Sequence, residues 1–128
     1  DQHGMPAYAK KKIEMTAESH ANAVTLANEK GVKIALGTDI WGTGIWGRNA
    51  EELPLLVDCG LTPLQAIETA TANGPATLGP QAPKSGQLKE GFDGDVICVN
   101  GDPSSDITVL TDPANVTHVW KGGVRHKG

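Results

Sequence analysis

Few side chains in this sequence are placed for catalysis, and Asp39 is the best candidate among them. It follows a short apolar segment, residues 32–36, and the pair Gly37-Thr38. In α/β folds, ligand sites form where buried strands end, because the loops that follow are free to vary. A carboxylate at that point can hold a metal ion or take a proton from water. The same placement is also typical of an Asx turn or a helix cap, so the local pattern leaves both roles open.

The loop after Asp39 contains two of the three tryptophans. Trp41 and Trp46 lie in the Gly-rich segment 40–49. Large rings in a loop beyond the end of a strand are suited to form the apolar walls of a ligand pocket. They could equally pack the loop onto its own scaffold. Trp41 and Trp46 are therefore candidate substrate contacts, with a packing role as the alternative.

The four histidines lack the spacing of a metal site. His3 precedes a long helical segment, His20 lies within it, and His118 and His126 belong to a later segment rich in β-formers. None of them forms a His-x-His pair, and a hydrolytic metal site needs about three protein ligands and an open position. His3 is either a substrate contact or a solvated terminal residue. We expect the other three to have no role as ligands.

Apolar residues recur on one helical face between residues 6 and 30, at Ile13, Ala17, Ala21, Val24 and Ala27. This spacing predicts a long amphipathic helix. Gly31 follows as a helix terminator, and the apolar run 32–36 predicts a parallel strand that is covered on both faces. A helix that leads directly into a buried strand indicates an α/β fold.

Two further helices are predicted before residue 79. Asn49 could cap the first of them, with Glu52 at the capping-box position, but Pro54 implies a later start or a kink. Thr62-Pro63-Leu64-Gln65 predicts the start of the second, because it combines a Thr cap, a proline at the first position and a Gln three residues after the cap. We expect Asn73-Gly74-Pro75 to end that helix.

Beyond residue 79, Gly and Pro interrupt short segments that have no helical period. Residues 95–100 and 116–121 are typical of strands, and Gly122-Gly123 is typical of a hairpin turn into a last strand at 124–126. The C-terminal part of the chain is therefore expected to be rich in β-structure.

Composition restricts the class of function. The 15 acidic and 11 basic residues give a net charge of −4, and the basic cluster is Lys10-Lys11-Lys12. A nucleic-acid-binding domain would instead carry a basic stripe with interleaved aromatic residues. No apolar run reaches the roughly 18 residues of a membrane span. We expect a soluble chain without nucleic-acid or membrane partners, in a compartment that the sequence leaves open.

Several of these segments together resemble the C-terminal part of the amidohydrolase superfamily. They are residues 31–39, 51–53, 60–67, 70–71 and 78–79, followed by residues 85–88, 95–97, 102–103 and 119–123. Within the superfamily, the sequence is most similar to the imidazolonepropionase-like and Xaa-Pro dipeptidase-like branch, which includes the fungal ochratoxinase-type amidases. The runs 70–73, 79–83 and 117–122 especially resemble that last type.

The resemblance implies an α/β fold class with two parts. Residues 1–79 would be the C-terminal portion of a (β/α)₈ amidohydrolase barrel, with the last strand and its flanking helices, and residues 80–128 a β-rich segment of the small sandwich domain. Because 128 residues are too few for a whole barrel of about 200 or more, the resemblance implies a fragment or a truncated homologue.

The resemblance also implies a metal-dependent hydrolase that cleaves C–N bonds in small amide or dipeptide-like substrates. Family members hold one or two divalent ions, here expected to be Zn²⁺, through a His-x-His pair, a carboxylated Lys, two further His and an Asp after the eighth strand. Only the Asp maps onto this sequence, at Asp39. By resemblance Asp39 is both metal ligand and general base, and Trp41, Trp46 and His3 contact the substrate.

Because the other ligands are missing, the chain alone is expected to be inactive and to need the remainder of the barrel or a homo-oligomer. The alternative is a non-catalytic binding or assembly module that retains a remnant of the fold. A reading frame that continues upstream with a His-x-His after an apolar strand would favour the enzyme. A genuine start just before Asp1 would favour the module.

Overall fold

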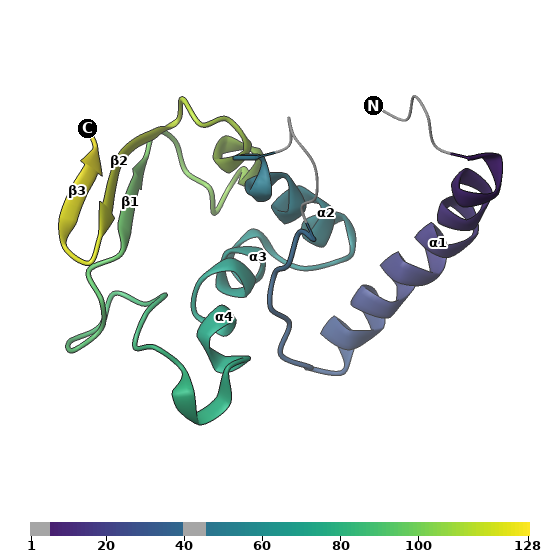
Figure 1. The fold of residues 1–128 in the computed structure, drawn as a ribbon, viewed down its shortest axis with the longest axis horizontal. Coiled ribbons are helices and arrows are strands. Elements are labelled where there is room, and N and C mark those ends of the chain that lie inside the picture. Colours follow the sequence, from purple (N-terminus) through teal and green to yellow (C-terminus); the bar gives the residue numbers. More distant parts are fainter. Residues whose placement is uncertain (1–5, 40–45) are drawn as a thin grey trace.

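Helices occupy the first part of the chain and strands the last in the computed structural model, which describes residues 6–39 and 46–128 (Figure 1). The α-helices are α1 (Ala7–Glu29), α2 (Glu52–Asp58), α3 (Pro63–Ala70) and α4 (Asn73–Ala76). Three 3₁₀ turns are η1 (Asn49–Glu51), η2 (Gly79–Gln81) and η3 (Ile107–Thr111), and the strands are β1 (Val96–Val99), β2 (Val116–Lys121) and β3 (Val124–Lys127). The strands form one antiparallel sheet in the order β1-β2-β3.

The helix expected over residues 6–30 is confirmed as α1, which ends at Glu29, and Gly31 follows two residues later with a left-handed φ of 67°. Its C-terminal end joins the rest of the molecule, since Thr25 Oγ1 donates to the carbonyl of Cys59 (2.9 Å) and Asn28 Nδ2 to that of Gly60 (3.0 Å). No residue of α1 is buried, and Ile13 on the expected apolar face is 50% exposed. In Figure 1, α1 lies at one end of the molecule and the sheet at the other. Within 6–39 and 46–128, no helix has both the length and the apolar character needed to cross a membrane.

The strand expected over residues 32–36 is not formed within the described residues, where residues 32–39 carry no strand pairing. A strand needs a neighbouring backbone to pair with along its edge. The hydrogen-bond partners of this segment instead lie near the end of α3 and at the start of α4. The Leu36 N–H donates to the carbonyl of Thr69 (2.9 Å), and Asn73 Nδ2 donates to that of Ile34 (3.0 Å).

The second helix begins later than residue 49, as Pro54 implied. The turn η1 comes first, and α2 starts at Glu52, so Pro54 lies in the first helical turn, where its missing N–H has no helical partner to lose. The expected capping box from Asn49 to Glu52 is wrong, because neither N-terminus has a side-chain cap.

The capping box of α3 is confirmed. The backbone N–H of Thr62 donates to Gln65 Oε1 (2.8 Å), and the backbone N–H of Gln65 donates to Thr62 Oγ1 (3.2 Å). The helix ends at Ala70. Asn73-Gly74-Pro75, expected as a terminator, forms the start of α4 instead.

The predicted strands of the C-terminal part are confirmed, with bounds within one or two residues of those expected. Gly122 and Gly123 have φ values of 56° and 77°, as a type I′ hairpin turn requires at both central positions. The carboxylate of Asp95 accepts from Lys121 Nζ (2.5 Å) and from the backbone N–H of Gly122 (2.8 Å). These bonds fasten the start of β1 to the turn between β2 and β3.

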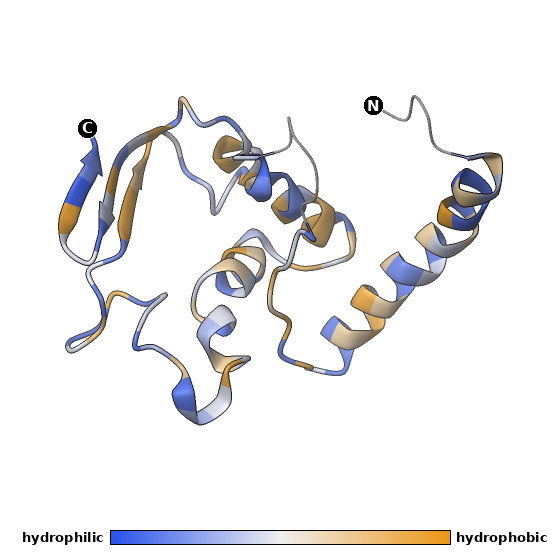
Figure 2. Ribbon diagram, viewed as in Figure 1, coloured by the Kyte–Doolittle hydropathy of each residue, from blue (hydrophilic) through white to orange (hydrophobic). Residues whose placement is uncertain are grey.

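A small core joins the helices to the C-terminal part. Leu53 of α2, Ala66 of α3 and Ile107 of η3 form one buried cluster, with half-buried Leu36 and Leu110 packed against it. Elsewhere much apolar surface stays exposed, and Figure 2 shows β1 as one of the most hydrophobic segments although Ile97 within it is 52% exposed. The core therefore fixes α2, α3 and η3 relative to one another and leaves apolar residues of α1 and β1 uncovered.

The loop before β1 approaches the end of α3 closely at Gly86. A Cβ on Gly86 would overlap the carbonyl oxygen of Thr71, and its φ is 75°, whereas Gly91 has a φ of 78° with open space around it. Gly91 is therefore a matched control for the conformation without the contact.

We expect Gly86→Ala to lower the free energy of unfolding by about 1–3 kcal/mol more than Gly91→Ala, because both lose the left-handed preference of glycine but only the first adds a clash. Urea denaturation of the two variants and the unchanged chain measures the difference. Equal losses of unfolding free energy in the two variants would show that the added Cβ at residue 86 causes no destabilising clash with Thr71.

The hydrogen bond from Lys121, followed by that from the Gly122 N–H, lowers the pKa of Asp95. A lowered pKa gives stability that is present above the ordinary aspartate pKa and is lost as the pH falls through the lowered value. We therefore expect Asp95→Asn to be destabilised at pH 7 and to approach the unchanged chain below about pH 4. Denaturation midpoints between pH 7 and 3 test this, with Glu90→Gln as the control. A difference in midpoint between Asp95→Asn and the unchanged chain that stays constant across this pH range would contradict the lowered pKa of Asp95.

Candidate functional site

Asp39 lies at the end of segment 32–39 and is exposed to solvent. Its φ of 43° is left-handed, and no other non-glycine residue within 6–39 and 46–128 has a positive φ. Asp adopts this conformation more readily than most residues do, because its short polar side chain can bond locally. The backbone therefore turns sharply at the residue that we singled out for chemistry.

Segment 32–39 is held from one side by the end of α3 and the start of α4. Thr69 accepts from the Leu36 N–H, and Asn73 donates to the Ile34 carbonyl. Thr69 is itself 2% exposed, and its hydroxyl donates to the carbonyl of Ala66 (2.6 Å). One of the two groups that hold the segment thus belongs to the buried part of α3, and the other is the first residue of α4.

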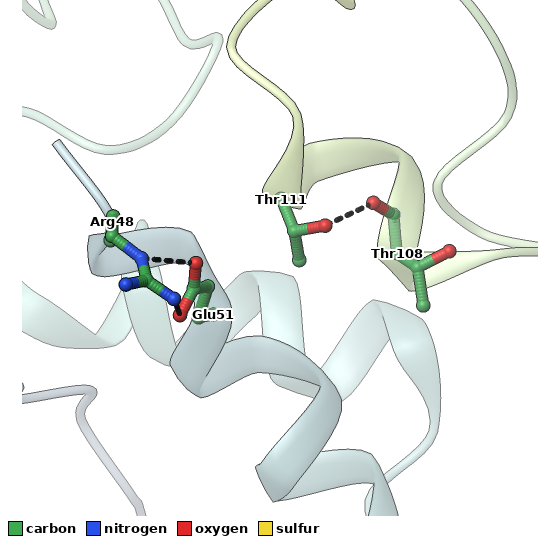
Figure 3. A network of polar contacts seen from close by, with 4 residues as sticks. All are labelled: Arg48, Glu51, Thr108 and Thr111. Atoms are coloured by element: carbon green, nitrogen blue, oxygen red, sulfur yellow. Dashed lines mark hydrogen bonds and ion pairs between the residues drawn. The ribbon is translucent and has the colours of Figure 1, made fainter. Parts of the chain in front are cut away.

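Beyond the loop, the chain is fixed again at Arg48. Its guanidinium makes a two-pronged contact with Glu51, Nε to Oε1 at 2.6 Å and Nη2 to Oε2 at 2.8 Å (Figure 3). The hydrogen bond to Glu51 raises the pKa of Arg48 above its already high value, so the guanidinium stays charged. An exposed pair of this kind contributes little to stability, and it links the residue before η1 to the last residue of η1. Figure 3 also shows η3 beside η1, where Thr111 Oγ1 donates to the carbonyl of Thr108 (2.8 Å).

The other candidate site residues are only partly placed. Trp46 is 72% exposed. Trp41 and His3 lie outside the described residues, so the structure does not test whether they gather around Asp39. His118 stacks on Trp120 within β2, with ring centroids 5.5 Å apart.

No three His, Cys, Asp or Glu side chains converge as a metal site in the part of the chain that the structure describes. Asp39 offers a carboxylate oxygen, a ligand type that zinc accepts, but one carboxylate is too few for a hydrolytic site. The described residues therefore do not hold a catalytic metal by themselves.

A cavity of about 450 Å³ lies between the helices and the sheet. Thr71 is the one polar side chain among the residues that line it: Ala50, Leu53, Ile67, Ala70, Thr71, Ile97, Val99, Pro103, Leu110 and Val116. The lining of this cavity has no group for acid–base chemistry, so Asp39 remains the candidate for the reaction.

Sequence reasoning missed the Arg48–Glu51 pair and the role of Asn73 in this region. Arg48 and Glu51 have opposite charges three positions apart, a spacing that places side chains together on a helical turn, so their pairing could have been found. The sequence indicates Asn73 only as part of a helix terminator. Nothing local signals its bond to Ile34, because the two residues are distant in sequence.

The chain has clear relatives among known proteins. The model of the amidohydrolase family matches residues 3–125. Ochratoxinase of Aspergillus niger is 50% identical over 118 residues, which cover 91% of this chain and 24% of that protein. The chain thus spans about a quarter of the length of this curated relative.

Solved structures agree with the sequence relatives. The crystal structure of A. niger ochratoxinase aligns with a TM-score of 0.85 and 46% identity, over 97% of this chain and 28% of that one. A Xaa-Pro dipeptidase with bound methionine in its active site aligns with a TM-score of 0.72 and 38% identity, over 84% of this chain and 25% of that one. The described arrangement of helices and strands therefore recurs within larger proteins.

Because Trp46 is exposed, we expect Trp46→Ala to change the free energy of unfolding by less than about 0.5 kcal/mol. If Trp46 lines a substrate pocket, we expect Trp46→Ala to lower kcat/KM in a longer polypeptide that carries the activity. Tyr8→Ala, which removes a similarly exposed ring from α1, is the control. Unchanged kinetics with a large loss of thermal stability would show that Trp46 packs its own loop instead.

Proposed function

This chain belongs to the amidohydrolase family, and from that membership we propose that it is part of a hydrolase that cleaves C–N bonds in small amide or dipeptide-like molecules. The observation that carries the proposal is the family match over residues 3–125, together with 50% identity to an ochratoxinase. The similarity to a Xaa-Pro dipeptidase supports a substrate with an amide bond next to an amino-acid carboxylate.

We propose further that residues 1–79 are the C-terminal βα part of a barrel and residues 80–128 the β-rich tail of a sandwich domain. Three features of the described residues support this division. The helix α1 has no buried residue, segment 32–39 lacks a neighbouring strand, and helices give way to strands after residue 79. The remainder of the barrel would cover α1 and pair with segment 32–39 as its last strand.

In this proposal Asp39 takes the proton of the attacking water and supplies one ligand to the metal. Its exposed carboxylate at the end of segment 32–39 supports both roles. One or two divalent ions, with Zn²⁺ the expected metal, would polarise the scissile carbonyl and lower the pKa of bound water. Since the described residues hold no cluster of three ligands, the other ligands would come from the remainder of the barrel or from a second copy.

We expect Asp39→Asn in the full-length enzyme to lower kcat by about 10²–10⁴-fold, because the amide keeps the shape of the side chain but cannot accept the proton. The assay follows hydrolysis of N-acyl amino acids and dipeptides. Asp58→Asn, an exposed aspartate at the end of α2, is the control. Activity within threefold of the unchanged enzyme would remove Asp39 from the mechanism.

The 128-residue chain alone is expected to hydrolyse none of these substrates with added Zn²⁺, Mn²⁺ or Co²⁺, because one carboxylate cannot assemble the site. The assay uses purified chain with a chelator control. Turnover that a chelator abolishes, that co-elutes with the chain and that Asp39→Asn removes would overturn this expectation. It would also indicate that a second copy supplies ligands.

A further inference from the structure

We propose that Asn73 is a positioning residue for Asp39. The inference rests on the function proposed above, in which Asp39 accepts a proton. Its basis is the hydrogen bond from Asn73 Nδ2 to the carbonyl of Ile34, which joins the first residue of α4 to the segment that ends at Asp39.

The bond is one of a pair on the same side of the segment. Ile34 accepts from Asn73 and, two residues later, the Leu36 N–H donates to the carbonyl of Thr69. In extended backbone, residues two apart direct their polar groups to the same edge. Thr69 and Asn73 thus act in place of an adjacent strand, one providing an acceptor and the other a donor.

The chain from Thr69 to Asn73, which supports the segment, is attached to the core at Thr69. Thr69 is 2% exposed, and Ala66, to whose carbonyl its hydroxyl donates, is fully buried in the core. Gly86 lies directly against the backbone of Thr71, which is part of the chain between Thr69 and Asn73. A segment bonded at residues 34 and 36 to this support has its end, at Asp39, held in a defined place.

Of the two bonds that hold the segment, only the one from Asn73 can be removed by substituting a side chain. Within the described residues, the two bonds at Ile34 and Leu36 are the hydrogen bonds that tie residues 33–39 to another element, and only the Asn73 bond comes from a side chain. Groups that orient a catalytic ligand without touching the reactants affect activity or metal affinity by about 10–100-fold when removed.

The chain offers a close control in Asn28. Its Nδ2 also donates to a backbone carbonyl at 3.0 Å, that of Gly60, and it is half-buried like Asn73, but its bond joins α1 to the loop before α3. Removal of either amide deletes the same kind of bond. Only removal of Asn73 loosens the segment that leads to Asp39.

The experiment uses the full-length enzyme with the best-hydrolysed member of a panel of N-acyl amino acids and compares four variants: Asn73→Ala, Asn73→Asp, Asn28→Ala and Asp39→Asn. We expect both Asn73 variants to lose about 10–100-fold in kcat with KM within twofold, because Asp is nearly isosteric with Asn but cannot donate. We expect Asn28→Ala to keep kcat within twofold, although its melting temperature falls as much as that of Asn73→Ala. Zinc affinity, measured by competition with a chelator, should weaken in the Asn73 variants and not in Asn28→Ala.

The outcomes separate this inference from the proposed function. If Asp39→Asn is inactive while Asn73→Ala matches Asn28→Ala in kcat and zinc affinity, Asn73 has no positioning role. Full activity of Asn73→Asp would also overturn the proposal, since the donor would then be dispensable. If Asp39→Asn itself keeps its activity, the proposed role of Asp39 fails and the positioning role fails with it.

Discussion

The contact between Leu53, Ala66 and Ile107 is the interaction on which the remaining structure depends. Ala66 is completely buried, and its single methyl group lets α3 pack closely against α2 and η3. Once α3 is fixed there, its last turn presents the Thr69 carbonyl, and the chain just beyond it presents Asn73, to the segment that ends at Asp39. The core thus connects the C-terminal part of the chain to the candidate site through one short helix.

The same structure shows how little apolar surface this chain covers. Large apolar side chains stay exposed on α1, on segment 32–39 and on β1, including Ile13, Val32 and Ile97. Exposed apolar patches of this kind are typical of surfaces that contact other parts of a protein. In the larger enzyme that we propose, a barrel would cover α1 and segment 32–39, and a completed sandwich would cover β1.

The features that the sequence predicted are those with local causes. The capping box of α3 uses residues three apart, the glycine turn before β3 uses adjacent residues, and α1 follows from a helical repeat, so each could be identified without the fold. Pairing between segments that are distant in sequence could not be identified in this way. Residues 32–36 have the composition of a strand but find a helix end as partner, and the bond from Asn73 to Ile34 spans 39 positions. For the candidate site, the sequence indicated Asp39 but not the groups that hold its segment.

We propose that segment 32–39, held by α3 and α4, presents Asp39 to a metal ion. A crystal structure of the full-length enzyme, with anomalous data collected at the zinc edge, measures this directly. We expect a metal peak about 2.0–2.2 Å from a carboxylate oxygen of Asp39, with the hydrogen bond from Asn73 to Ile34 intact. A metal peak whose ligands all lie elsewhere, with the carboxylate of Asp39 directed to solvent, would contradict it.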